Sequence, residues 1–207
     1  MAGYFLDSSE VMKMRKPRAA TIAVNAILFA LILIFMMVPI QIGPLRLAVL
    51  MLIPVLIAGQ TQKPSVAIAA GMFLGLVSFI TSIVMPTSVL SYIFNNPLVS
   101  VLPRACIGVV VYLTYRLIRK PIKNEALGHV VASFVSSILG VITNTGLVSL
   151  MLWIFYHGKD ISGTVIDAEF MLGVILANFV IELIVCALLT PPISLAVKKT
   201  VERADRR

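Results

Sequence analysis

The chain has 207 residues, of which 59% are hydrophobic and 13% are charged, and its mean hydropathy is +1.03. Soluble domains contain about 45–50% apolar and about 25% charged residues, so this composition is that of a membrane protein. A transmembrane helix needs about 20 apolar residues. The length therefore allows about six helices and excludes a separate nucleotide-binding or catalytic domain.

Six apolar runs predict a single, all-α transmembrane domain over residues 1–207. The first run follows a basic segment and has no small-residue cleavage pattern after it, so we interpret it as a retained helix rather than a signal peptide. The second run is short and contains Pro54, and we expect it to be tilted, kinked or only partly inserted. The last two are long enough to tilt or to extend beyond the bilayer. The predicted spans are residues 19–38, 45–58, 65–85, 99–117, 130–155 and 170–197.

The formal charge of +8 arises from 17 Lys and Arg against 9 Asp and Glu. If the N-terminus is cytoplasmic, all of the basic residues except Arg46, Arg104 and Lys159 fall in cytoplasmic segments or span ends. This bias predicts that both termini lie inside the cell, because positive residues gather in cytoplasmic loops. The charge therefore requires no nucleic-acid partner.

Three segments are then external: residues 39–44, 86–97 and 156–169. The second and third are the longer ones. Loops of about a dozen residues without clear structure are often lids or binding loops, although each can also be a simple linker.

The sequence carries no pattern of catalytic or metal-binding residues. Cys106 and Cys186 lie in separate spans without the C-x-x-C spacing of a redox or metal site. His129 and His157 are expected near opposite membrane faces, and no protease, hydrolase or zinc motif is present. Residues 59–65 resemble a phosphate loop but lack its second Gly and its spacing. We therefore expect no cofactor and no ATP hydrolysis by this chain alone.

Small residues recur at helical spacing in three of the runs. They let helices approach closely in lipid, where burial of apolar surface gives no gain, and so they mark either internal packing or contact with a partner. The stripes are Ala19, Ala23, Ala26 and Ala30 in the first run, Ala67, Gly71 and Gly75 in the third, and Gly128, Ala132, Ser136, Gly140 and Asn144 in the fifth.

Polar residues at membrane depth suggest a binding site, because they are costly to place there. Arg104, Asn144 and Asn178 come from three runs and are expected about 7–17 Å below the external surface at 1.5 Å per residue. A guanidinium suits a carboxylate or phosphate, so the three could hold an anionic small molecule with hydroxyl or amide groups. Interhelical hydrogen bonds, or a pairing of Arg104 with the deeper Glu182, are the structural alternatives. Further candidates around this pocket are Thr145, Tyr92, Asn95, Asn96, Gln41 and Trp153.

The segments LIPVLIAG (52–59), AGMFLGLVSF (70–79) and NPLVSVLPRACIG (96–108) resemble the substrate-binding S-components of energy-coupling factor (ECF) vitamin transporters. The similarity covers nearly the whole chain and includes Asn144 and Thr145 in the fifth run. Within that family, the chain is most similar to the pantothenate-specific S-component. S-components for folate, riboflavin or hydroxymethylpyrimidine are alternatives.

The resemblance implies a high-affinity vitamin-binding subunit of the cell membrane that lacks its own ATPase. Its partners would be a transmembrane coupling subunit and two ATPase subunits, and it would reorient in the membrane to carry the vitamin inward. The family's docking motif for the coupling subunit falls on Ala26 and Ala30 in AILFA (26–30). A stand-alone secondary transporter or a small membrane enzyme are the other classes, but we find neither an internal repeat nor a catalytic cluster.

Overall fold

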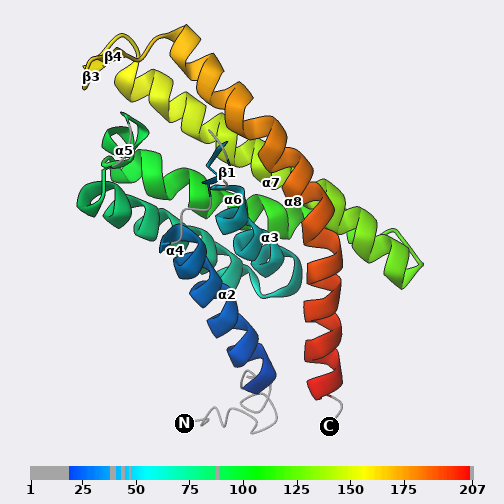
Figure 1. Cartoon of the computed structure of the whole chain (residues 1–207). Helices are drawn as coiled ribbons and strands as arrows, with labels where there is room; N and C mark the ends of the chain where they lie inside the picture. Colours follow the sequence, from blue (N-terminus) through cyan, green and yellow to red (C-terminus); the bar gives the residue numbers. More distant parts are fainter. Residues whose placement is uncertain (1–18, 38–40, 43–44, 47, 87–88, 206–207) are drawn as a thin grey trace, which may run out of the picture.

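The computed structural model describes residues 19–37, 41–42, 45–46, 48–86 and 89–205 (Figure 1). Within this part of the chain, five helices are long and apolar enough to cross a membrane. They coincide with the first, third, fourth, fifth and sixth predicted runs. They are α2 (Ala19–Met37), α4 (Pro64–Val84), α6 (Pro97–Arg119), α7 (Glu125–Tyr156) and α8 (Ala168–Asp205).

The second predicted run does not form a spanning helix. It is divided among strand β2 (Leu45–Arg46), which pairs with β1 (Gln41–Ile42), the 3-10 turn η1 (Ala48–Met51) and helix α3 (Leu52–Thr61). The ten residues of α3 rise only about 15 Å, half the thickness of the hydrocarbon layer. Every residue from Leu52 to Gln60 is buried. The segment is apolar because it forms the protein core, so the predicted count of six spans is not confirmed.

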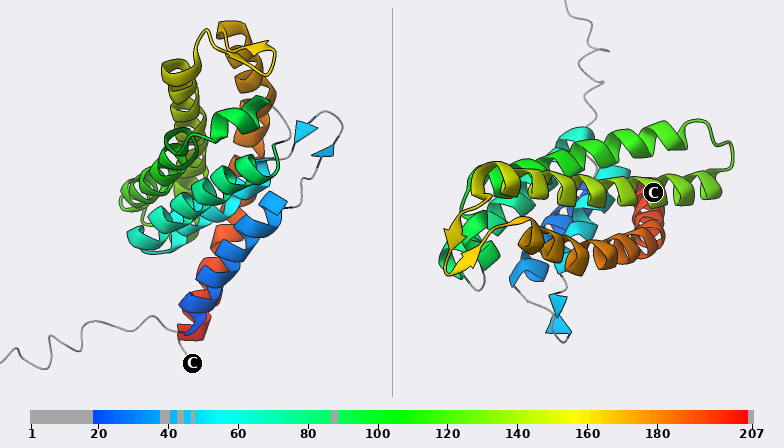
Figure 2. Two further views of the ribbon diagram at one scale, coloured as in Figure 1. Left: turned by 90° about the vertical axis from the view of Figure 1, so that its left-hand side faces the viewer. Right: turned by 90° about the horizontal axis from the view of Figure 1, so that it is seen from above.

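Helix α3 lies inside the bundle and contacts α2, α4, α6, α7 and α8. Around it, α4 packs on α6, α6 on α7, and α7 on α8, and Figure 2 shows this succession from two sides. The core that joins them is formed by fully or nearly fully buried aliphatic side chains, among them Leu56, Leu74, Ile107, Val111 and Val141.

Two of the three small-residue stripes form internal helix contacts. A Cβ atom added to Gly75 of α4 would lie 2.6 Å from the Cα atom of Val101 in α6. A Cβ atom added to Gly108 of α6 would lie 2.6 Å from the carbonyl carbon of Ala67 in α4. The stripe on α7 is buried throughout its length. For these helices, close backbone approach explains the small residues without an external partner.

The second and third of the segments predicted to be external contain helical or strand structure in their described residues. Residues 86–97 include the short helix α5 (Val89–Phe94), and residues 156–169 include the hairpin of β3 (Asp160–Ile161) and β4 (Thr164–Val165). An apolar cluster attaches both segments to the bundle; it consists of Ile93, Val99, Leu152, Ile166 and Met171. These segments are therefore packed caps rather than loose linkers.

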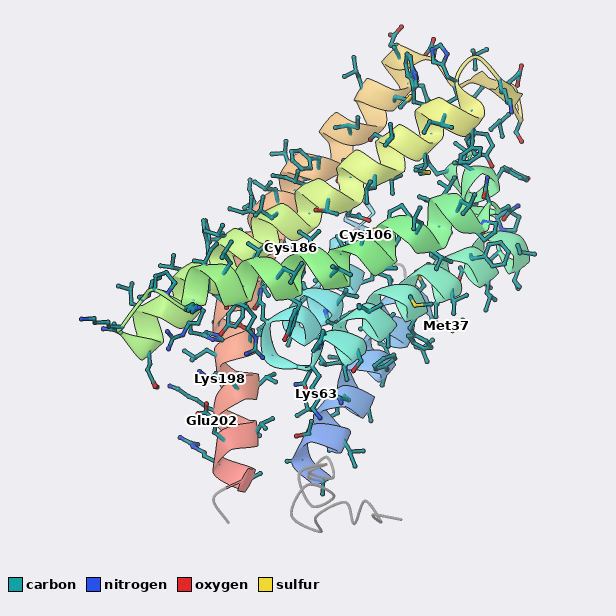
Figure 3. All side chains as sticks on the ribbon, turned by 180° about the vertical axis from the view of Figure 1, so that it is seen from behind. Met37, Lys63, Cys106, Cys186, Lys198 and Glu202 are labelled. Carbon is teal, nitrogen blue, oxygen red and sulfur yellow. The ribbon has the colours of Figure 1, made fainter. Side chains whose placement is uncertain are left out.

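Helix α8 bends where it carries Pro191 and Pro192 (Figure 1). Proline has no N–H group, so the carbonyls four residues earlier lose their helical hydrogen bonds. The segment after the bend carries Lys198 and Glu202, which lie with Lys63 toward one end of the molecule (Figure 3).

Candidate functional site

Arg104 lies on α6, half-buried, one residue after a proline inside the helix. Pro103 cannot donate to the carbonyl of Val99, four residues earlier. The Arg104 side chain takes over this role, since its Nη1 donates to the Val99 oxygen at 3.0 Å. Its guanidinium also lies over the ring of Phe94 on α5, 4.6 Å from the ring centre. The Pro-Arg pair thus fixes the guanidinium beside α5.

The backbone at Arg104 is held by close contact with α4. A Cβ atom on Gly71 would lie 2.9 Å from the carbonyl carbon of Arg104 and 3.2 Å from the Cα atom of Ala105. Only a glycine permits this approach without displacing one helix. Consequently, α4 and α5 together determine where the guanidinium lies.

Two other polar side chains, both buried, come from α7 and α8. Asn144 is buried, and its Oδ1 atom has no hydrogen-bond partner. Glu182 is 8% exposed. No ion pair within 4.0 Å joins these two residues in the described structure. Arg104 therefore keeps donors that no described residue engages, and Asn144 keeps a free acceptor.

Arg104, Asn144 and Asn178 can be compared by their distance from the helix ends that carry α5 and the β3–β4 hairpin. At 1.5 Å per residue, Arg104 lies about 10 Å from the start of α6, Asn178 about 15 Å from the start of α8, and Asn144 about 18 Å from the end of α7. These distances describe depth along each helix alone; laterally, α6 contacts α7, and α7 contacts α8.

The remaining predicted residues fall into different environments. Asn178 and Thr145 are half-buried, and Asn178 has an interaction partner. Asn96 caps α6, because its Oδ1 accepts from the backbone N–H of Leu98 at 3.0 Å. Tyr92 and Trp153 are 45% and 49% exposed. The side chain of Gln41 lies outside the described part, although its backbone belongs to β1.

The small-residue stripe of α2 differs from the other two because it faces away from the bundle. Ala19, Ala23, Ala26 and Ala30 are all exposed, whereas Leu28 and Ile32 are the buried residues of this helix. In a protein that lies in lipid, a face of this kind is available to another transmembrane helix.

A buried polar network was not foreseen from the sequence. Gln60 at the end of α3 donates through Nε2 to Ser133 O, Ser136 Oγ and Ser137 Oγ at 3.0–3.2 Å. His129 is fully buried, with Nδ1 2.7 Å from Tyr115 Oη and Nε2 3.0 Å from Ser194 Oγ. In the sequence, this network is indicated by Ser133, Ser136 and Ser137, whose i, i+3 and i+4 spacing places them on one face of α7.

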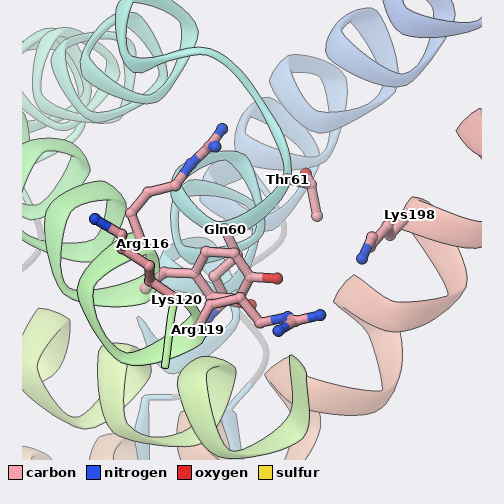
Figure 4. Close-up of a pocket in the computed structure, with 7 residues that line it drawn as sticks. Gln60, Thr61, Arg116, Arg119, Lys120 and Lys198 are labelled. Carbon is pink, nitrogen blue, oxygen red and sulfur yellow. The ribbon is translucent and has the colours of Figure 1, made fainter. Parts of the chain in front are cut away.

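A cavity of about 450 Å³ lies beside this network, between α3, α6 and α8 (Figure 4). Its position is near the C-terminal end of α6, away from Arg104. Its basic residues were explained from the sequence by membrane orientation alone. The basic residues are Arg116, Arg119, Lys120 and Lys198, and the lining also includes Gln60, Thr61 and Tyr115.

Comparison with known proteins identifies the family. The family model described as "ECF transporter, substrate-specific component" matches residues 20–194, which include all five long helices in whole or in large part. No curated protein matches the chain. Members of this family work with a transmembrane coupling subunit and ATPase subunits. The chain therefore belongs to the family of ECF transporter substrate-specific components, and it is a membrane-embedded, substrate-binding transport subunit rather than an enzyme.

Proposed function

We propose that the transported substrate is pantothenate, bound from the external side among α6, α7 and α8. Pantothenate has a carboxylate at one end and hydroxyl and amide groups along its length. The family assignment supports a small-molecule substrate. The choice of pantothenate rests on the Arg104 guanidinium, which contacts Val99 and Phe94 but has no carboxylate of the described chain in direct contact.

In this arrangement, the vitamin carboxylate accepts hydrogen bonds from the free donors of Arg104. An unpaired guanidinium at membrane depth is costly, so an anionic ligand supplies the missing partner. The Oδ1 atom of Asn144 accepts from a ligand hydroxyl or amide N–H and thereby gains the hydrogen bond that it lacks. Glu182 accepts from a second hydroxyl. Thr145, Asn178 and the external cap complete the pocket.

The first experiment measures saturable binding of radiolabelled pantothenate to the purified chain in lipid nanodiscs. Pantothenol, in which an alcohol replaces the carboxylate, is the matched competitor. We expect pantothenol to bind about 10- to 100-fold more weakly, because it lacks a charge-assisted hydrogen bond of about 1.5–3 kcal/mol. Saturable binding only of folate, riboflavin or hydroxymethylpyrimidine would refute the choice of pantothenate.

The role of Arg104 is tested by Arg104→Gln beside the control Lys159→Gln. Lys159 is also on the predicted external side, but it lies over the ring of Tyr156 in the cap. Arg104→Gln is expected to weaken pantothenate about 10- to 100-fold and to leave pantothenol nearly unchanged. A parallel melting curve separates this effect from unfolding. If Arg104→Gln weakens both ligands equally, Arg104 stabilises the helix through the Val99 carbonyl and does not bind the ligand carboxylate.

The exposed stripe of α2 supports docking of the coupling subunit through Ala26 and Ala30. Replacement of either alanine by leucine would hold the two helices apart. We expect Ala26→Leu to abolish co-purification of the coupling subunit and transport, with pantothenate binding retained. Ala69→Leu is the control, because Ala69 is an exposed alanine on α4. Loss of assembly in both variants, or in neither, would contradict this docking surface.

A further inference from the structure

The basic cavity beside α6 belongs to no part of the proposed vitamin site. Along α6, Arg116 lies about 18 Å beyond Arg104. The cavity draws positive charge from two separate helices, because Arg116, Arg119 and Lys120 come from the end of α6 and Lys198 comes from α8. Arg119 and Lys198 extend toward one another across its opening (Figure 4). No acidic residue lines it.

The positive charge of the cavity is only partly balanced. Lys198 forms an ion pair with Glu202, 3.7 Å from Nζ to Oε1. Arg119 donates to the carbonyl of Ile122 at 2.8 Å, and the Arg116 guanidinium lies 5.2 Å from the ring centre of Tyr112. Within the described chain, none of the three α6 cations has a carboxylate in direct contact. The cavity is therefore suited to an anion, and arginine side chains favour phosphate oxygens.

The positions of the cations along α6 fit the headgroup region of a bilayer that this helix crosses. Arg116 and Arg119 are 19 and 22 residues after Pro97, the first residue of α6. At 1.5 Å per residue, they lie about 29–33 Å along the helix, which matches the thickness of about 30 Å of the hydrocarbon layer. The bias of basic residues predicts that this end is cytoplasmic.

One exposed face of α6 continues from the basic residues into apolar ones. Leu113 and Leu117 are 59% and 75% exposed, and they alternate with Arg116 and Lys120 at the i, i+3, i+4 and i+7 spacing of one helix face. An acyl chain can lie along the leucines while a headgroup enters the cavity. A free phosphate ion would use the cations but not this apolar path.

We propose that the cavity binds the phosphate headgroup of an anionic phospholipid of the cytoplasmic leaflet. Basic pockets between transmembrane helices on that side are typical sites for such headgroups. Since Arg119 belongs to α6 and Lys198 belongs to α8 beyond its proline bend, the bound headgroup links the two helices. The anionic lipid thus holds the last segment of α8 against α6.

The test uses the full chain in detergent and native mass spectrometry with added phosphatidylglycerol or phosphatidylcholine of identical acyl chains. The variant Arg116→Gln/Lys198→Gln removes one cavity cation from each helix. The control Lys123→Gln/Lys199→Gln removes the same charge from exposed residues that do not line the cavity. Melting temperatures measured in parallel confirm that both proteins are folded.

We expect the wild-type chain to retain phosphatidylglycerol in preference to phosphatidylcholine. The cavity variant should bind phosphatidylglycerol roughly 30-fold more weakly, because it lacks two basic residues that each contribute about 1 kcal/mol. The control should bind phosphatidylglycerol as the wild type does. Equal retention of the two lipids, or equal losses in the two variants, would overturn the proposal. If inorganic phosphate binds the chain as tightly as phosphatidylglycerol does, the site recognises a free anion, and the lipid assignment is overturned.

Discussion

Replacement of Gly71 by alanine tests whether close packing of α4 on α6 positions the binding site. The added Cβ atom would lie 2.9 Å from the Arg104 carbonyl carbon, and its oxygen is nearer still. To reach an ordinary contact of 3.4 Å with the carbon, the helices must separate by about 0.5 Å, and the oxygen requires a larger shift. Because the contact is with backbone, no side-chain rotation can relieve it.

Two opposing contributions determine the change in stability that we expect for Gly71→Ala. Alanine is favoured over glycine inside a helix by up to about 1 kcal/mol. Insertion of a methyl group into a filled interface costs about 1–3 kcal/mol. Because the contact is with backbone, we take the upper part of this cost, about 2–3 kcal/mol. The net destabilisation is then about 1–2 kcal/mol, or a melting temperature about 2–8 °C lower for a domain of this size. Gly146→Ala on α7 is the matched control, because no atom lies within 4 Å of the added Cβ and only the favourable term remains.

The assay is thermal unfolding in the same detergent, followed by pantothenate titration of each protein. Gly71→Ala should melt below the wild type and bind pantothenate more weakly, since Arg104 moves with its backbone. Gly146→Ala should melt at or slightly above the wild type with unchanged affinity. If Gly71→Ala is as stable as Gly146→Ala, the packing of α4 on α6 does not fix the position of Arg104.

Three further predictions concern buried polar atoms. Gln60→Leu should destabilise the chain by about 1–3 kcal/mol in thermal unfolding, since acceptors on α7 lose their donor; an unchanged melting temperature would contradict the network. Tyr115→Phe should cost about 1 kcal/mol through loss of the 2.7 Å hydrogen bond to His129, whereas Tyr112→Phe should cost almost nothing. Asn144→Leu should raise the melting temperature of the ligand-free protein, because it removes an unpartnered buried oxygen, and should reduce the stabilisation by added pantothenate. If neither quantity changes, Asn144 has no role in the pocket.

Hydropathy and length predicted the long helices well because a lipid-facing helix must be apolar along its whole length. The same signal was misleading at α3, since a fully buried segment is just as apolar as a lipid-facing one. The length of the run was the better guide, because apolar stretches of about 10–14 residues are more often core helices than spans. Pro54 fits this interpretation, since it lies in the first turn of α3, where a missing N–H is tolerated.

The candidate site was only partly accessible from the sequence. The place of Arg104 within a long apolar helix followed from the sequence, but its hydrogen bond to the Val99 carbonyl depends on a three-dimensional contact that no periodicity expresses. The basic cavity was missed for a different reason. Arg116 and Lys198 are 82 positions apart, and both were already explained by membrane orientation. One residue can serve orientation and binding at once, so the first explanation did not exclude the second.

The proline pair of α8 has a consequence for how this helix opens. Pro191 and Pro192 leave the carbonyls of Ala187 and Leu188 without helical donors, so the ladder of hydrogen bonds is interrupted in the middle of a continuous ribbon. Local unfolding of one segment of α8 therefore need not spread to the other, and we expect the two segments to unfold at different rates. In hydrogen-exchange experiments, α8 should therefore behave as two units, with amides before the prolines protected by the bundle and amides near Thr200 exchanging much sooner.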